Sequence, residues 1–178
     1  ACNTSSAVAI PALQNLSDIP VIGVIEPGAE QAAKTTKNKR IGVIGTEGTI
    51  HSGAYTVAIN KLLPEAVIFS QPCPLFVPLV EEGWQEHYVA NIIAEEYLVD
   101  MKKQNIDTLV LGCTHYPLLS KTIQKVMGEE VTLVDSAKAI AAYLSCYLDR
   151  ENDGQKGKDT FYVSDNESKF SEIAQRIL

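Results

Sequence analysis

The chain has 178 residues, of which 46% are hydrophobic and 21% charged, a balance typical of a globular protein with a sizeable core. Its 15 basic and 22 acidic residues give a net charge of −7 spread along the chain, which disfavours nucleic acid as a partner. No signal-peptide pattern opens the chain and no apolar run approaches the ~20 residues that span a bilayer, so we expect a cytoplasmic protein without a membrane partner.

Short apolar, β-branched runs alternate with helical patterns along almost the whole chain. Runs that are apolar throughout predict the strands of a parallel sheet covered on both faces. The charged stretch 149–159 is predicted to be a solvated turn. The sequence therefore indicates an α/β protein. Its predicted strands are 19–25, 40–45, 66–70, 107–112, 131–135 and 160–164, and its predicted helices lie near 4–16, 52–62, 84–104, 116–127, 136–148 and 166–178.

Two cysteines occur in similar contexts, Cys2 in "ACNTSSA" and Cys113 in "LGCTHYPLL". Each is expected to follow a strand, which for Cys2 would end at Ala1, and to begin a helix. Two similar αβ lobes, each delivering one cysteine, would explain this repetition.

Ligands of parallel sheets bind beyond the carboxyl ends of the strands, where helix N-termini favour negative charge. Such a position lowers the pKa of a thiol, so Cys2 and Cys113 could each act as a base. Asn3, Thr4 and Thr114 would supply side-chain donors to an anionic small ligand.

The stretch "GTEGT" follows another predicted strand, and Gly48 allows close approach of the backbone between Thr46 and Thr49. These two threonines bind the ligand or cap the following helix, and the sequence favours neither interpretation. His115 lies two residues after Cys113 and could orient or protonate that thiol, or hold a substrate carboxylate. Together these residues would cradle an amino acid without a metal or cofactor.

The four cysteines form no CxxC motif or Cys/His cluster, which disfavours zinc and predicts free thiols. Cys73 lies between two prolines and Cys146 lies within a predicted helix, so both are interpreted as small hydrophobic residues.

Six stretches resemble the glutamate racemase family in order and spacing over essentially the whole chain. They are "ACNTSSA", "PVIGVIEPGA", "IGVIGTEGTIHSGAY", "CPLFVPLVEEG", "DTLVLGCTHYPLL" and "VDSA". The His in "GCTHYPLL" is the glutamate form, because aspartate racemases of the same superfamily generally carry Glu there.

The resemblance implies cofactor-independent interconversion of L- and D-glutamate, supplying D-glutamate for peptidoglycan. Two cysteine bases would face opposite sides of the α-carbon. The implied catalytic residues are Cys2, Cys113 and His115, the implied substrate-binding residues are Asn3, Thr4, Thr46, Thr49, Thr114 and His115, and Glu81 is implied as a partner of the histidine.

The resemblance also implies two pseudo-symmetric αβα lobes with the active site between them. Residues 1–25 and 135–178 would form part of one lobe and 26–134 the other. The family's N-terminal "DSG" and "PYG" segments would precede "ACNT", so we expect a longer natural chain and low activity if the chain begins at Ala1. A homodimer is a further expectation.

Three alternatives stay open at this point. They are an aspartate racemase or a related Cys-using decarboxylase or isomerase, a non-catalytic amino-acid-binding domain, and a cysteine hydrolase that uses Cys113 with His115.

Overall fold

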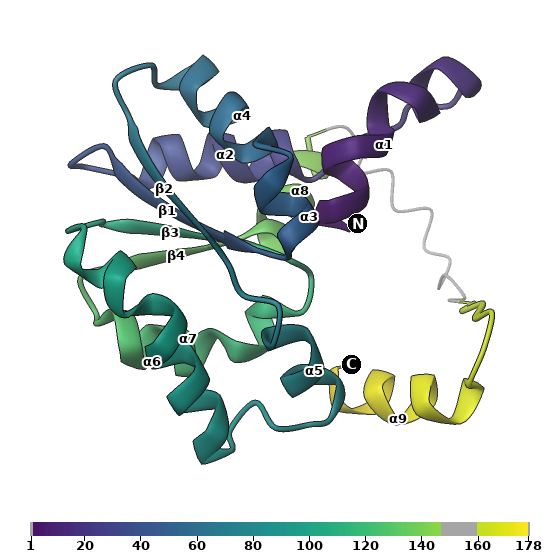
Figure 1. Cartoon of the computed structure of the whole chain (residues 1–178). Coiled ribbons are helices and arrows are strands. Elements are labelled where there is room, and N and C mark those ends of the chain that lie inside the picture. Colours follow the sequence, from purple (N-terminus) through teal and green to yellow (C-terminus); the bar gives the residue numbers. More distant parts are fainter. Residues whose placement is uncertain (1, 147–159, 178) are drawn as a thin grey trace.

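The computed structural model of the protein describes residues 2–146 and 160–177, and at its centre lies a four-stranded sheet (Figure 1). Neighbouring strands pair in parallel in the order β2-β1-β3-β4. This arrangement confirms the predicted α/β class. The strands are β1 (Arg40–Gly45), β2 (Val67–Pro72), β3 (Thr108–Gly112) and β4 (Thr132–Asp135).

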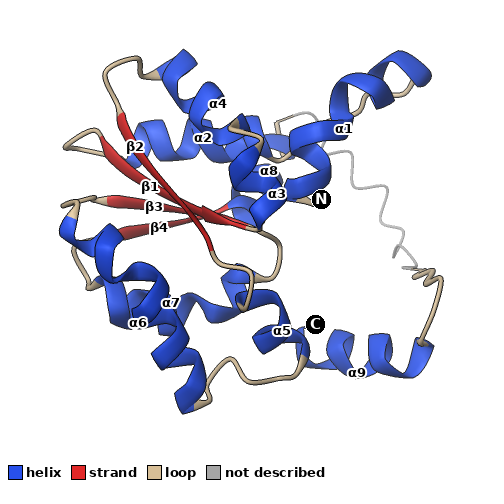
Figure 2. Cartoon of the chain, viewed as in Figure 1, coloured by secondary structure: helices blue, strands red, loops and turns tan. Residues whose placement is uncertain are grey.

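Helices cover both faces of the sheet. Figure 2 shows α2, α4 and α8 on one face and α6 and α7 on the other, while α1 and α9 lie toward the outside. The helices are α1 (Asn3–Leu16), α2 (Ile25–Thr35), α3 (Glu47–His51), α4 (Ala54–Leu62), α5 (Phe76–Glu81), α6 (Tyr88–Lys103), the 3₁₀ helix η1 (Tyr116–Leu119), α7 (Ser120–Met127), α8 (Ser136–Leu144) and α9 (Glu167–Ile177).

Successive strand side chains alternate between two cores, which is why the strands are apolar along their whole length. Val43 and Val110 pack with Ile59 on the α2/α4 face. Ile44 and Leu111 point to the opposite face and pack with the α6/α7 layer. Each such burial contributes roughly 1.5–3 kcal/mol, so both layers hold the central strands β1 and β3 in place.

The predicted strands at 19–25 and 160–164 are wrong. Both segments are irregular, apart from Ile25, which begins α2. A strand needs a neighbouring backbone to complete its hydrogen bonds, and the first segment instead lies along α1. There the Val24 N–H donates to the Ser6 hydroxyl (3.2 Å) and the Gln14 amide donates to the Val21 carbonyl (3.0 Å).

Helix α2 is absent from the sequence-based prediction, because Pro27 and Gly28 are typical of a turn. Proline is tolerated in the first turn of a helix, where its missing N–H has no intrahelical partner. Glycine at position 28 leaves room for a packed side chain, since a Cβ there would lie 2.9 Å from the Tyr55 hydroxyl. The predicted helix 52–62 begins only at Ala54, after Gly53 with φ +65°, which separates it from α3.

The division into lobes of 1–25 with 135–178 and of 26–134 stays a prediction. The sheet described here spans residues 40–135. The predicted strand end at Ala1 and the predicted turn at 149–159 lie outside the described residues.

Candidate active site

The candidate site lies at the carboxyl-terminal edge of the sheet. Thr46 follows β1 and Cys113 follows β3, and the register pairs Gly45 with Gly112. The two segments therefore leave the sheet side by side. The first turn of α1 reaches the same edge, because the Thr4 hydroxyl lies 2.8 Å from that of Thr46. Segments far apart in the sequence therefore converge here (Figure 1).

Cys2 is the N-cap of α1 and its side chain is exposed. Partial burial opposes ionisation of its thiol, but the neighbouring N–H and hydroxyl groups of Ser5 and Thr4 stabilise the thiolate. Their effect outweighs the burial, and the pKa of Cys2 lies below its ordinary value, as predicted for a helix N-terminus.

Cys113 is only 6% exposed. Burial raises the pKa of its thiol, although the nearby N–H groups of His115 and Tyr116 act to lower it, and a negative charge on Cys2 raises this pKa further. The predicted lowering of the pKa is therefore wrong for Cys113, because the sulfur lies at the end of a fully buried strand and is withdrawn from water.

The two thiols thus differ in protonation despite their similar sequence contexts. Near neutral pH Cys2 carries more thiolate, whereas Cys113 stays protonated. Each also lies within electrostatic reach of the other, since charge on Cys2 shifts the pKa of Cys113. The site can therefore present a proton acceptor and a proton donor together.

Three threonine hydroxyls form a triangle that joins the first turn of α1 to α3 and its N-cap. The distances are 2.8 Å for Thr4–Thr46, 3.0 Å for Thr4–Thr49 and 3.1 Å for Thr46–Thr49. Thr46 also caps α3, its hydroxyl accepting from the Thr49 N–H (3.4 Å), which confirms the capping interpretation for Thr46. Ligand binding by Thr46 and Thr49 stays a prediction. Gly48 lets α3 approach, since a Cβ there would lie 3.0 Å from the Thr4 methyl. Such hydroxyls can reorient to donate to a carboxylate.

The Asn3 side chain is buried and turned into the protein. Its oxygen accepts from the Tyr55 hydroxyl (2.7 Å) and its nitrogen donates to the Ser136 hydroxyl (3.2 Å). Both ends of the amide thus have internal partners. The predicted role of Asn3 as a side-chain donor to substrate stays a prediction. Sequence reasoning missed Tyr55 and Ser136. The available signal was general: a tyrosine on the buried face of a helix needs a partner for its hydroxyl.

His115 stands between Cys113 and Glu81. Its Nδ1 lies 3.9 Å from the Cys113 sulfur and its Nε2 lies 3.4 Å from Glu81 Oε1, with both side chains partly exposed. Thr114 is exposed, and its hydroxyl lowers the pKa of Cys113 through a hydrogen bond. The line Cys113–His115–Glu81 can orient a proton donor at the buried thiol.

The other two cysteines differ in exposure. Cys73 is fully buried, and burial raises its pKa, as the interpretation as a small hydrophobic residue requires. Cys146 is exposed beyond the end of α8, contrary to the interpretation as a packed residue, because α8 ends at Leu144.

Within residues 2–146 and 160–177, no three His, Cys, Asp or Glu side chains gather as a metal site would require. No helix in these ranges has both the length and the apolar character needed to cross a membrane.

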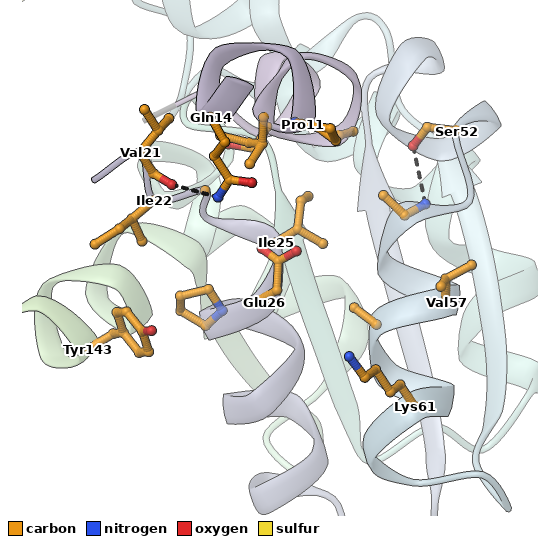
Figure 3. A pocket seen from close by; sticks show the side chains of 17 residues that line it. Pro11, Gln14, Val21, Ile22, Ile25, Glu26, Ser52, Val57, Lys61 and Tyr143 are labelled. Carbon is orange, nitrogen blue, oxygen red and sulfur yellow. Dashed lines mark hydrogen bonds between the residues drawn. The ribbon is translucent and has the colours of Figure 1, made fainter. Parts of the chain in front are cut away.

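A groove of about 660 Å³ lies away from the thiols, between α1, α2 and α4 (Figure 3). Apolar side chains such as Ile25 and Val57 line it together with Glu26 and Lys61. Neither Cys2 nor Cys113 contributes to its wall, so this groove is separate from the candidate site.

Comparison with known proteins identifies relatives of the whole chain. The family model described as "Asp/Glu/Hydantoin racemase" matches residues 1–144. The glutamate racemase of Geobacter metallireducens is 49% identical over 183 residues, which cover 100% of this chain and 67% of that protein. The glutamate racemase of Lactiplantibacillus plantarum gives the same identity and the same coverage.

Solved structures agree with these matches. Glutamate racemase isoform RacE1 from Bacillus anthracis superimposes with a TM-score of 0.91 at 41% identity, covering 99% of this chain and 67% of that chain. The Francisella tularensis glutamate racemase, solved in complex with D-glutamate, gives a TM-score of 0.80 at 35% identity, covering 98% of this chain and 66% of that chain. The chain therefore spans about two thirds of the length of these relatives.

Proposed function

Because the chain belongs to the Asp/Glu/Hydantoin racemase family, we propose that it interconverts L-glutamate and D-glutamate by proton transfer between two thiols. The relatives with the same name and the complex with D-glutamate support this substrate. The observation that carries the two-thiol part is geometric: the first turn of α1, which follows the exposed Cys2, meets the edge of the sheet where the buried Cys113 follows β3. The pKa values of the two thiols shift in opposite directions, as an acid and a base require.

Inversion at a carbon requires removal of a proton from one face and delivery of a proton to the other. A single base cannot conveniently serve both faces, whereas two groups on separate elements can. In the proposed mechanism the Cys2 thiolate removes the α-proton of one enantiomer and the Cys113 thiol protonates the opposite face. The reverse direction starts from the exchanged protonation states. Each positioned acid or base contributes about 10²–10⁴-fold to the rate.

Loss of the α-proton places negative charge on the carboxylate of the substrate. We assign the hydroxyls of Thr4, Thr46 and Thr49 to this carboxylate, since they form one cluster that includes Thr4, two residues after Cys2, and can turn their protons toward an anion. Thr114 and the main-chain N–H groups after Asn3 and Cys113 would bind the remaining polar groups of glutamate.

His115 is assigned to the Cys113 side. Its contact with Glu81 fixes the ring, and its other nitrogen faces the thiol, so it can pass a proton to or from Cys113. The same line would suit a cysteine hydrolase, but such an enzyme has no use for a second thiol of lowered pKa.

The proposed setting is the cytoplasm, where the product D-glutamate would enter peptidoglycan precursor synthesis. The homodimer predicted from the resemblance stays a prediction.

The decisive assay incubates the purified protein with L-glutamate or D-glutamate in D₂O. Nuclear magnetic resonance follows exchange of the α-proton, while circular dichroism follows loss of optical activity. Racemisation with exchange from both enantiomers is the expected result. Faster racemisation of aspartate would assign the protein to aspartate instead, and binding of glutamate without exchange would identify a binding domain.

The two-thiol part is tested with Cys2→Ser and Cys113→Ser. Each variant should nearly abolish racemisation, because a serine hydroxyl is too weak an acid to form its alkoxide near neutral pH. With glutamate analogues that eliminate a leaving group after proton removal, the two variants should prefer opposite enantiomers. If both variants prefer the same enantiomer, the two-base assignment is wrong.

A further inference from the structure

Tyr55 contacts the segments that carry both thiols, although it is distant from each in sequence. It lies on α4 with only 2% of its surface exposed. Its hydroxyl donates to the side-chain oxygen of Asn3 at 2.7 Å, and Asn3 immediately follows Cys2. This bond anchors the first turn of α1 to the body of the protein.

The ring of Tyr55 packs against the segment of the other thiol. A Cβ at Gly112, the residue before Cys113, would lie 3.1 Å from Cε2 of the ring, so the ring rests directly on the backbone there. The hydroxyl occupies a niche at Gly28, where a Cβ would lie 2.9 Å away. Glycines at both positions thus make room for this one side chain.

A second hydrogen bond holds Asn3 from the other direction. The Asn3 nitrogen donates to the Ser136 hydroxyl at 3.2 Å, and Ser136 is the first residue of α8, directly after β4. Burial raises the pKa of Tyr55, so its phenol stays a neutral donor throughout the working pH range. The chain Tyr55–Asn3–Ser136 therefore joins α4, α1 and α8 at the edge of the sheet.

From these contacts we infer that Tyr55 is a positioning residue for the proposed racemisation: it sets the separation of Cys2 and Cys113 by holding Asn3 while packing on Gly112. The inference rests on the proposed function for its kinetic consequences. Its geometric content, that the Tyr55 hydroxyl fixes the first turn of α1, does not depend on the substrate.

The kinetic test compares Tyr55→Phe with Thr122→Val. Thr122 is the control, because it is also buried and its hydroxyl donates to the Gln85 carbonyl at 2.9 Å, in a contact that involves neither thiol segment. Both variants lose one buried donor and should show similar decreases in melting temperature. We expect Tyr55→Phe alone to lower kcat by up to about 10²-fold, the loss that follows ~1 Å misplacement of reacting groups. KM should change far less.

A second readout does not use glutamate. The pH dependence of Cys2 alkylation by iodoacetamide, followed by mass spectrometry, reports how far the donor groups in the first turn of α1 stabilise the Cys2 thiolate. Loosening of that turn in Tyr55→Phe should move the labelling midpoint of Cys2 to higher pH, whereas Thr122→Val should leave it unchanged. Ser136→Ala removes the other bond to Asn3 and should act in the same direction, which provides a test if Tyr55→Phe fails to fold.

Three outcomes would overturn the inference. They are an unchanged kcat in Tyr55→Phe, equal losses of kcat in Tyr55→Phe and Thr122→Val, and an unshifted Cys2 midpoint in Tyr55→Phe and Ser136→Ala. If the wild-type protein does not racemise glutamate, the proposed function fails, and the labelling midpoint alone decides the inference.

Discussion

Replacing Thr49 by valine removes one hydroxyl while it preserves the branched shape of the side chain, and this change separates stability from activity. Thr49 is 2% exposed, and its hydroxyl takes part in two of the three contacts of the threonine triangle, at 3.0 and 3.1 Å. The third contact, Thr4–Thr46 at 2.8 Å, survives, so each remaining hydroxyl keeps a partner.

The magnitudes follow from these contacts. Two lost hydrogen bonds of about 0.5–1.5 kcal/mol each predict a loss of about 1–3 kcal/mol in the free energy of unfolding. If the hydroxyl also donates to the carboxylate as its charge grows, its removal costs about 10²–10³-fold in kcat. Activity should thus fall much further than stability alone would cause.

Chemical denaturation and the glutamate exchange assay measure the two effects on one sample. Thr122→Val is the matched control, because Thr122 is 6% exposed and its hydroxyl donates to the Gln85 carbonyl at 2.9 Å, far from the thiols. It should lose stability but keep kcat. Wild-type kcat in Thr49→Val would refute the assignment of the triangle to the carboxylate.

Three further predictions concern charge. Iodoacetamide should label Cys2 before Cys113 at neutral pH, because Cys2 is exposed and its pKa is lowered, whereas burial raises the pKa of Cys113; peptide mass spectrometry gives the order. Glu81→Gln removes the anion beside His115 and should lower kcat by about tenfold, less than the loss of a direct acid or base, in steady-state assays. Partial burial raises the pKa of Asp107, but four donated hydrogen bonds outweigh it, so the pKa lies below its ordinary value of 3.8. The carboxylate therefore stabilises the fold at pH values above 3.8, and this contribution is lost as the pH falls through the pKa of the folded state. In acid denaturation followed by circular dichroism, the free energy of unfolding of Asp107→Asn should therefore fall less steeply than that of the wild type as the pH drops below 3.8.

Each of these has a clear contrary result. Equal labelling rates of the two thiols would contradict the assigned difference in protonation. Glu82→Gln is the control for Glu81→Gln, since Glu82 pairs with Lys169 rather than His115, and equal effects of both would rule out a specific role. An unchanged acid slope in Asp107→Asn would show that other carboxylates control it.

The sequence predicted the four strands that pair with one another, because a run that is apolar throughout needs only burial on both faces to become a strand. It failed at 19–25, where an equally apolar run has no neighbouring backbone among the described residues. The pKa of Cys113 could not be predicted either, since the depth of its burial depends on the core that β3, α5, α6 and η1 form together, which no local pattern shows.

The internal partners of Asn3 show the same limit. Tyr55 lies 52 residues away and Ser136 lies 133 residues away, so their convergence is a property of the fold and leaves no local pattern. By contrast, Thr46 and Thr49 could be singled out from the sequence, because two threonines three residues apart directly after a strand are typical both of a ligand site and of a helix cap.

The supports of the two thiols differ in stiffness. Cys113 extends from β3, whose backbone is bonded to β1 on one side and β4 on the other. Cys2 is the N-cap of α1, and side-chain hydrogen bonds of Asn3, Thr4 and Ser6 join this helix to the rest of the protein. Widening the gap between the sulfurs would therefore break a few side-chain hydrogen bonds and leave the sheet intact, so we expect any change in their separation to come from α1 and not from β3.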